Sequence, residues 1–290
     1  MRAFTCGRRQ PGDTFYLDFN PCVREPKTWK EEIYAAAKLL ANRAGSRPIW
    51  LASSGGTDSE VMCRAFFDQG INFSVLTVEH IAGTNRHDTA YARAWCRARA
   101  IPQKIVELDM PAFLSNDVFE YTRKEYVTGN VYRYFQIRLL EEIDRLGGFG
   151  VIGSGEQLYQ AASGAVPYLE YEVGIMAPLQ WSERHNTEHE PFFYMSTPEI
   201  YRSYMDIPII ARNLHYRDIF IHRKNAFLLK RIATNAVWDD LRDRPKFTGY
   251  EHIRPHRLAA QKKLRGMFGD RIQTLRIPVD EVRNQLDARS

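Results

Sequence analysis

The sequence predicts an α/β fold in which a doubly wound, mainly parallel sheet is followed by a helical C-terminal region. Within residues 46–165, short apolar runs alternate with segments of helical periodicity, which is the pattern of parallel strands joined by crossover helices. The connections are short, and right-handed crossovers bring the strand ends, and with them a ligand, to one edge of the sheet. Residues 166–290 hold mostly helical patterns, and residues 1–45 are interpreted as an N-terminal arm and helix.

Local signals predict the first elements. Residues 1–25 lack periodicity and hold Gly, Pro and Asn turns, so we expect an extended arm. Thr28 and Glu31 form a capping box for a helix that runs to Gly45. Four strands are expected after it, at residues 49–52, 73–78, 104–108 and 149–153.

Helices are expected between these strands. The first covers residues 57 to about 69, with Thr57 and Glu60 as a second capping box. Two more helices precede the fourth strand. The helix at residues 88–100 is expected to carry an apolar face of Tyr91, Ala94, Trp95 and Ala98.

The pattern changes in the C-terminal half. Residues 160–195 look irregular and are rich in Pro, Glu and His. His185 and His189 lie there, and we expect solvated side chains rather than a zinc site. Further helices are expected to begin at a capping box of Ser196 and Glu199, and to cover residues 218–233 and 255–267.

The composition excludes several classes of protein. The chain has 290 residues, of which 44% are hydrophobic and 26% charged, enough for a sizeable core. No stretch approaches the length needed to span a bilayer, and no signal peptide is visible. The four cysteines form no C-x-x-C pair, so we expect neither a zinc knuckle nor a disulfide framework, and a cytoplasmic location.

The C-terminal end of the chain is basic. The formal net charge is +5, and residues 241–290 hold 12 Lys and Arg against 6 Asp and Glu. Such a segment can meet phosphate, in nucleic acid or in a nucleotide, or it can be a solvated helix face. If the partner is tRNA or DNA, phosphate contacts are expected from Lys262, Lys263 and Arg265.

One segment has the composition of an anion site. It follows the first strand and reads Ser53-Ser54-Gly55-Gly56-Thr57-Asp58-Ser59. Backbone N–H groups and the helix dipole at such a strand–turn–helix junction favour an anion, and glycines let the backbone approach it closely. The hydroxyls of Ser54, Thr57 and Ser59 can add hydrogen bonds to phosphate oxygens. Asp58 lies so near that Mg²⁺ is expected between its carboxylate and the phosphates.

The segment from Ser54 to Ser59 resembles S-G-G-x-D-S, the PP-loop of the N-type ATP pyrophosphatases, also called adenine nucleotide α-hydrolases. The resemblance covers about residues 47–160 and implies a Rossmann-like fold of the HUP type. It implies that ATP is cleaved between its α- and β-phosphates to adenylate an acceptor. The loop residues implied to hold the leaving pyrophosphate are Ser54, Gly55, Gly56, Thr57 and Ser59. Asp58 is implied to place Mg²⁺, and Ala52, Ser53 and Val78 to frame the adenine.

Two further segments are candidates for the same site. Gly153-Ser154-Gly155-Glu156 follows the fourth strand, so it is expected at the same sheet edge. It resembles a segment of asparagine synthetase-like members, although further acidic residues do not follow Glu156 here. This departure weakens the case for amidation in particular, while Glu156 is still expected to contact a second metal or the ribose. Lys246, in a loop marked by Pro and Gly, is the candidate for the C-terminal lysine that such enzymes often bring to the pyrophosphate.

The sequence leaves the acceptor open. It could be a nucleobase in tRNA or DNA or a small carboxylate, attacked by an amine or ammonia. Ammonia would come from solution or a partner, because no N-terminal glutaminase is visible. A non-catalytic nucleotide-binding module is the alternative. A sulfonucleotide reductase is less well supported because no cysteine follows Cys96. Whether the chain forms a homo-oligomer is also open.

Overall fold

The computed structural model describes residues 1–8, 14–155, 157–160, 166–216, 223–241, 249 and 251–288, with the backbone alone at 215–216 and 223–227. Its centre is a four-stranded parallel sheet in the order β5-β4-β3-β6. The strands are β3 (Ile49–Ala52), β4 (Ser74–His80), β5 (Gln103–Leu108) and β6 (Phe149–Ile152). All four predicted strands are therefore confirmed, with shifts of one or two residues at their ends.

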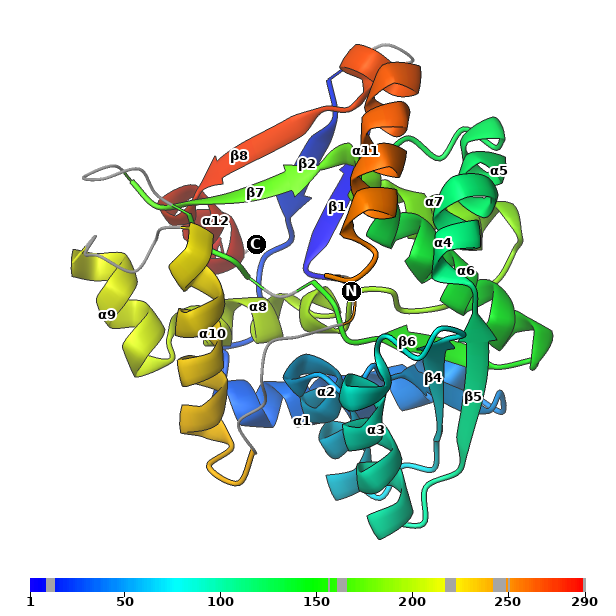
Figure 1. The fold of residues 1–290 in the computed structure, drawn as a ribbon. Coiled ribbons are helices and arrows are strands. Elements are labelled where there is room, and N and C mark those ends of the chain that lie inside the picture. Colours follow the sequence, from blue (N-terminus) through cyan, green and yellow to red (C-terminus); the bar gives the residue numbers. More distant parts are fainter. Residues whose placement is uncertain are drawn as a thin grey trace.

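The strand order places a crevice beside β3. The chain runs outward from β3 to β4 and β5, then returns to add β6 on the other side of β3 (Figure 1). In open parallel sheets, ligands bind where the order reverses in this way, outside the carboxyl ends of the strands. Here that point lies between β3 and β6.

Helices cover both faces of the sheet. Leu51 and Val75 belong to one hydrophobic cluster, together with α1 (Trp29–Ala44) and α2 (Thr57–Asp68). Ala52 and Leu76, which point to the other face, belong to a second cluster. The second cluster draws on α4 (Met110–Ala112), the π-helical turn η1 (Phe113–Asp117), α5 (Val118–Arg123), α6 (Val131–Arg145) and α11 (Arg254–Phe268). The doubly wound fold class is therefore confirmed.

The expected N-terminal arm is instead a buried β-hairpin. β1 (Phe4–Gly7) pairs antiparallel with β2 (Tyr16–Phe19), and the Ala3 N–H donates to the Met195 carbonyl at 2.9 Å. Phe15, Leu17 and Phe19 are buried. Apolar residues at every second position are typical of a half-buried strand. Here the alternation covers only three such residues beside several turn residues, too few to predict a strand from the sequence.

Residues 160–195 are more regular than expected. They contain β7 (Tyr168–Glu172), the 3₁₀ turn η2 (Val173–Met176), α7 (Ala177–Arg184) and η3 (Phe193–Met195). His189, expected in solvent, is buried, and its Nδ1 accepts the N–H of Gly150 at 2.9 Å. β7 pairs antiparallel with β8 (Thr274–Pro278), far along the chain. Local patterns do not reveal such a distant pairing.

The rest of the C-terminal region is mostly helical, as predicted. It contains α8 (Pro198–Met205), α9 (Pro208–Tyr216), α10 (Arg223–Val237), α11, η4 (Gly269–Arg271) and α12 (Val279–Asp287). None of the helices in the described ranges is long and apolar enough to cross a membrane.

Three local expectations about helices need correction. The Thr28 capping box is present, but α2 is capped by Gly56, with no side-chain bond, rather than by Thr57. α8 is capped by Thr197 rather than Ser196, because Thr197 lies one residue before Pro198 and accepts the Ile200 N–H. On α3 (Arg86–Ala98) the buried residues are Thr89, Ala92, Trp95 and Cys96. The predicted face of this helix was therefore rotated.

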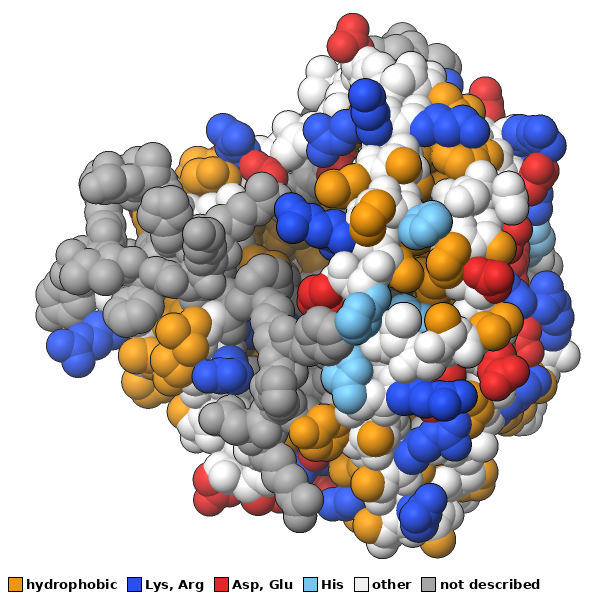
Figure 2. All heavy atoms as spheres, in the orientation of Figure 1, with side chains coloured by type: hydrophobic (Ala, Val, Ile, Leu, Met, Phe, Trp, Pro, Cys, Tyr) orange, Lys and Arg blue, Asp and Glu red, His pale blue; other side chains and the backbone are white. Residues whose placement is uncertain are grey.

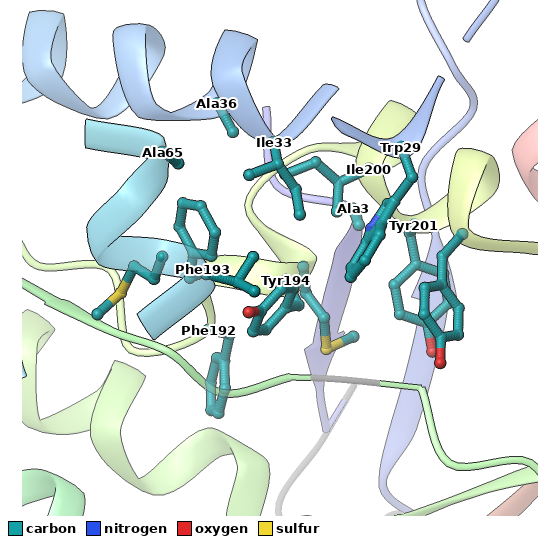
Figure 3. Close-up of a cluster of buried hydrophobic side chains, with 14 of the residues drawn as sticks. Ala3, Trp29, Ile33, Ala36, Ala65, Phe192, Phe193, Tyr194, Ile200 and Tyr201 are labelled. Atoms are coloured by element: carbon teal, nitrogen blue, oxygen red, sulfur yellow. The ribbon is translucent and has the colours of Figure 1, made fainter. Parts of the chain in front are cut away.

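An aromatic cluster holds the start of α2 in place. Figure 3 shows Trp29 of α1 beside Tyr194, with Phe192 and Phe193 next to it in the chain. The Trp29 and Tyr194 rings stack with centroids 6.1 Å apart. Ile33 and Ala65 bring α1 and α2 into the same cluster. Tyr194 is thereby positioned against the first turn of α2.

Candidate functional site

The turn between β3 and α2 is tightly built around Gly55. This residue has φ +95°, and a Cβ added to it would lie 1.9 Å from the carbonyl oxygen of Asp88 in α3. Any side chain would therefore collide with the backbone of the neighbouring helix. Ser54 is exposed, and Gly56, Thr57 and Asp58 are partly exposed. The turn thus presents its outer side to solvent while it packs on α3.

The hydroxyls of the turn divide into two groups. Ser53 and Ser59 are buried; the Ser53 hydroxyl donates to that of Ser59 at 3.2 Å, and Ser59 donates to the Gly56 carbonyl at 2.9 Å. The hydrogen bonds of these two serines stabilise the buried side of the turn. Ser54 Oγ accepts the Gly56 N–H at 3.2 Å on the outer side. Ser54 and Thr57 are therefore the hydroxyls best placed to meet a ligand.

Asp58 binds two residues that the sequence did not suggest. Nζ of Lys230, on α10, lies 2.6 Å from Asp58 Oδ2, and only 11% of the lysine side chain is exposed. The Tyr194 hydroxyl donates to the Asp58 carbonyl at 2.7 Å. No local signal marks either residue, because both lie more than a hundred positions from the loop.

The segment after β6 lies against the same turn. A Cβ added to Gly153 would be 3.2 Å from the Cα of Ser59. The segments that follow β3 and β6 therefore lie together at one edge of the sheet, as predicted. Ser154 Oγ donates to the Pro191 carbonyl at 2.6 Å and accepts from Gln136 at 2.8 Å. Gly155 has φ +90° and packs on Met195. Glu156 and Lys246 lie outside the described residues.

The three residues expected to frame the adenine lie close to the sheet edge. Ala52 is buried at the end of β3, and the next residue, Ser53, donates its N–H to Leu76 on β4 at 2.9 Å. Val78 does not end β4 as expected, since the strand continues to His80. Val78 is half-buried and packs against the same hydrophobic cluster as Ala52.

Hollows flank the turn on two sides. One lies between α10 and the aromatic cluster and is lined by Trp29, Asp58, Gln157, Tyr194, Ile200, Tyr204, Lys230 and Thr234. The other lies against α3 and is lined by Ser53, Gly55, Glu60, Cys63, Tyr91, Ala92, Trp95 and Cys96. The turn is therefore not sealed inside the protein.

Remote similarities are found among solved structures. No protein-family model matches the chain, and no curated protein matches it. The NMN synthetase of Francisella tularensis is 11% identical over 84% of this chain and 95% of its own, with a TM-score of 0.37. The NH3-dependent NAD synthetase of Campylobacter jejuni subsp. jejuni NCTC 11168, in complex with the nitrate ion, is 15% identical over 76% of this chain and 100% of its own, with a TM-score of 0.34. Neither likeness assigns an activity to this chain.

A further carboxyl group lies at the edge of the turn. The pKa of Asp88 is raised to about 6, chiefly by burial; His87 opposes the shift and the carboxylate of Glu251 adds to it. Gly249, just before Glu251, has φ +82°, and an added Cβ would lie 2.7 Å from the Thr84 carbonyl. The chain leading into α11 therefore touches the connection that follows β4, beside the turn.

The donor atoms at the turn suit a metal ion that is held mainly by phosphate. Asp58 offers a carboxylate, and Ser54 and Thr57 offer hydroxyl oxygens, which are the ligand types that Mg²⁺ prefers. No cluster of three or more His, Cys, Asp or Glu side chains occurs in the described part of the chain. One carboxylate alone holds such a cation only if further oxygen ligands come from a bound ligand or from water.

Proposed function

We propose that the chain belongs to the PP-loop superfamily, binds ATP at residues 54–59, and cleaves it to AMP and pyrophosphate to adenylate an acceptor. The observation that carries this proposal is the first turn of α2. Its N-cap, Gly56, makes no side-chain cap, and the backbone N–H groups and helix dipole of such a turn favour an anion. This turn lies at the crevice where the strand order reverses.

Lys230 is the residue proposed to meet the leaving pyrophosphate. It is largely buried and reaches Asp58 at the start of α2. A cation placed in a partly dry site stabilises charge that develops on a departing phosphate. Lys246, the candidate from sequence, remains a proposal for a second contact, as does Glu156 for the metal or the ribose.

Asp58, Ser54 and Thr57 are proposed to hold Mg²⁺ with the phosphates. When bound, the ion supplies positive charge that offsets the charge on the leaving pyrophosphate. In the adenylation step, an oxygen of the acceptor attacks the α-phosphorus, and the bond to the bridging oxygen breaks. Pyrophosphate leaves with the electron pair. An amine or ammonia then attacks the activated carbon, and AMP leaves in turn.

The cysteines argue against a reactive thiol. Burial raises the pKa of Cys6 and Cys22 to about 12 and that of Cys96 to about 11, and it raises the pKa of Cys63 as well. Thiols with raised pKa values are protonated at neutral pH and are poor nucleophiles. We therefore do not propose a sulfonucleotide reductase.

The test is product analysis with ATP labelled in its α- or γ-phosphate. The chain is incubated with Mg²⁺, ammonium and candidate acceptors, namely small carboxylates or a tRNA pool. The proposal expects AMP and pyrophosphate in equal amounts, and loss of both in Asp58→Asn. Asp239→Asn, an exposed carboxyl outside the turn, should keep activity. Release of ADP and phosphate would overturn the proposal, and tight ATP binding without cleavage would establish a binding module instead.

A further inference from the structure

α11 presents an unusually basic outer surface. Its sequence contains five basic residues and no acidic one. We define the basic face of α11 as Arg254, Arg257, Lys262, Lys263 and Arg265. Arg257 is half-buried and the other four are exposed. In Figure 2, Lys and Arg side chains gather over the part of the molecule where Figure 1 shows α11. Acidic groups flank this face at its ends, Glu251 before the helix and Asp270 after it.

Contacts with two other helices fix part of this face. Arg257 donates to the hydroxyl of Tyr132 on α6 at 3.0 Å. Lys263 Nζ lies 3.7 Å from the centre of the Phe119 ring on α5. Ordered cations lose less side-chain entropy when they bind a ligand than freely rotating ones do. The basic face is therefore partly prearranged.

The basic face begins beside the candidate ATP site. Gly249 contacts Thr84 and Asn85 at the sheet edge, and α11 starts five residues later. At 1.5 Å per residue, the helix extends about 22 Å away from that edge. Its five Lys and Arg residues lie at positions 254, 257, 262, 263 and 265 and span about 16 Å along the axis. A polyanion lying along α11 would thus have one end at the turn after β3.

The opposite side of α11 argues against a membrane partner. Ile253, Ala260, Leu264 and Phe268 are buried in the hydrophobic core, so most of the apolar side of the helix is covered, while Leu258 and Met267 are exposed singly. Membrane-surface helices need that side to enter the lipid. A phosphate backbone can contact these cations without requiring apolar contact.

We propose that the basic face of α11 binds a single-stranded segment of a structured RNA, with an unpaired base directed toward the turn after β3. Structured RNAs present unpaired bases in loops, whereas a duplex must first open to deliver one. The direction of the base toward the turn rests on the proposed function, because that base would be the acceptor that is adenylated. Binding of the RNA backbone itself requires no ATP.

The experiment is fluorescence anisotropy with a labelled RNA hairpin that carries an unpaired loop, compared with a DNA duplex of equal length. Lys262→Ala/Arg265→Ala removes two exposed cations. Lys38→Ala/Arg97→Ala, exposed on α1 and α3, is the matched control. We expect the α11 variant to bind the hairpin on the order of tenfold more weakly at 0.1 M salt. The slope of log K against log salt should become shallower by about 1.4, as for two lost phosphate contacts on a single strand.

Equal weakening in the control variant, or preference for the duplex, would overturn the inference, as would binding to anionic lipid vesicles in place of RNA. A thermal melt of each variant checks its folding. ATP binding by the wild-type chain is measured separately with a fluorescent analogue. RNA binding without ATP binding would reject the proposed function alone, and ATP binding without RNA binding would reject this inference alone.

Discussion

Lys230 and Asp58 lie 172 positions apart in the chain, and their side chains meet at 2.6 Å on the first turn of α2. The carboxylate is favourable there because the N-terminus of a helix carries partial positive charge. The ammonium group adds a full positive charge beside the same backbone N–H groups. The charge of Lys230 thereby neutralises the Asp58 carboxylate, so this carboxylate does not cancel the partial positive charge of the helix N-terminus.

Replacing Lys230 by Met should remove this charge while keeping a similar volume. If Lys230 stabilises the leaving pyrophosphate, the rate of AMP formation should fall on the order of 10²-fold, the size found when one such donor is lost. Lys230→Arg should retain part of the rate because the charge remains. The measurement is steady-state AMP release at saturating ATP.

Arg231→Met is the control for this substitution, because Arg231 is exposed on the same helix. It should change the rate by less than about threefold, as expected for a surface position away from the site. A Lys230→Met variant that cleaves ATP as fast as the wild type would show that the lysine serves only the fold.

Gly55→Ala should destabilise the protein much more than an ordinary glycine substitution. Gly55 and Gly70 both have positive φ, but an added Cβ meets the Asp88 carbonyl only at Gly55 and meets nothing at Gly70. Gly70→Ala should cost about 1 kcal/mol through backbone strain. Gly55→Ala should cost about 3 kcal/mol or more, because α3 must also shift. Urea unfolding of both variants gives the comparison, and equal costs would contradict the tight packing of the turn on α3.

The features that the sequence predicted well are those that local patterns determine. The four core strands, the helix after the loop and the position of Gly153 beside Ser59 all follow from apolar runs, turn residues and the geometry of parallel sheets. The loop could be recognised because seven consecutive residues carry its chemistry.

The features that were missed depend on long-range packing. β7 and β8 pair across about a hundred positions, and the β1–β2 hairpin becomes a buried element because α12 and the segment near Met195 cover it. Lys230 resembles any lysine in a helix until α10 is placed beside α2. Local periodicity carries no information about such contacts.

His189 should make the fold sensitive to mild acid. Burial lowers its pKa to about 4, and the nearby Asp144 only partly opposes this, whereas an unfolded histidine titrates near 6.5. As pH falls from about 6.5 toward 4, the unfolded chain takes up a proton that the folded chain does not, so stability is lost across this window. We expect this residue to contribute a loss of about 3 kcal/mol across the whole window.

His189→Asn is the matching variant, because its side-chain oxygen can still accept the Gly150 N–H that Nδ1 accepts. Its free energy of unfolding should fall less between pH 7 and 4.5 than that of the wild type. The measurement is urea unfolding at several pH values. Parallel pH profiles for the two proteins would show that His189 does not titrate as described.

Asp88 should have the opposite effect. Burial raises its pKa to about 6, above the value of about 3.9 for an unfolded aspartate. Below pH 4 the carboxyl is protonated in both states, so it carries no penalty. As pH rises through this interval the unfolded chain ionises first, and above pH 6 the folded chain bears the full cost of a buried charge, about 2 kcal/mol.

Asp88→Asn should therefore be more stable than the wild type at pH 7.5 and equal to it at pH 4. Asp270→Asn, exposed at the end of α11, should show no such difference. A destabilised Asp88→Asn at pH 7.5 would mean that the charged carboxylate makes a bond the fold requires, and that the edge of the turn is built around an ionised Asp88.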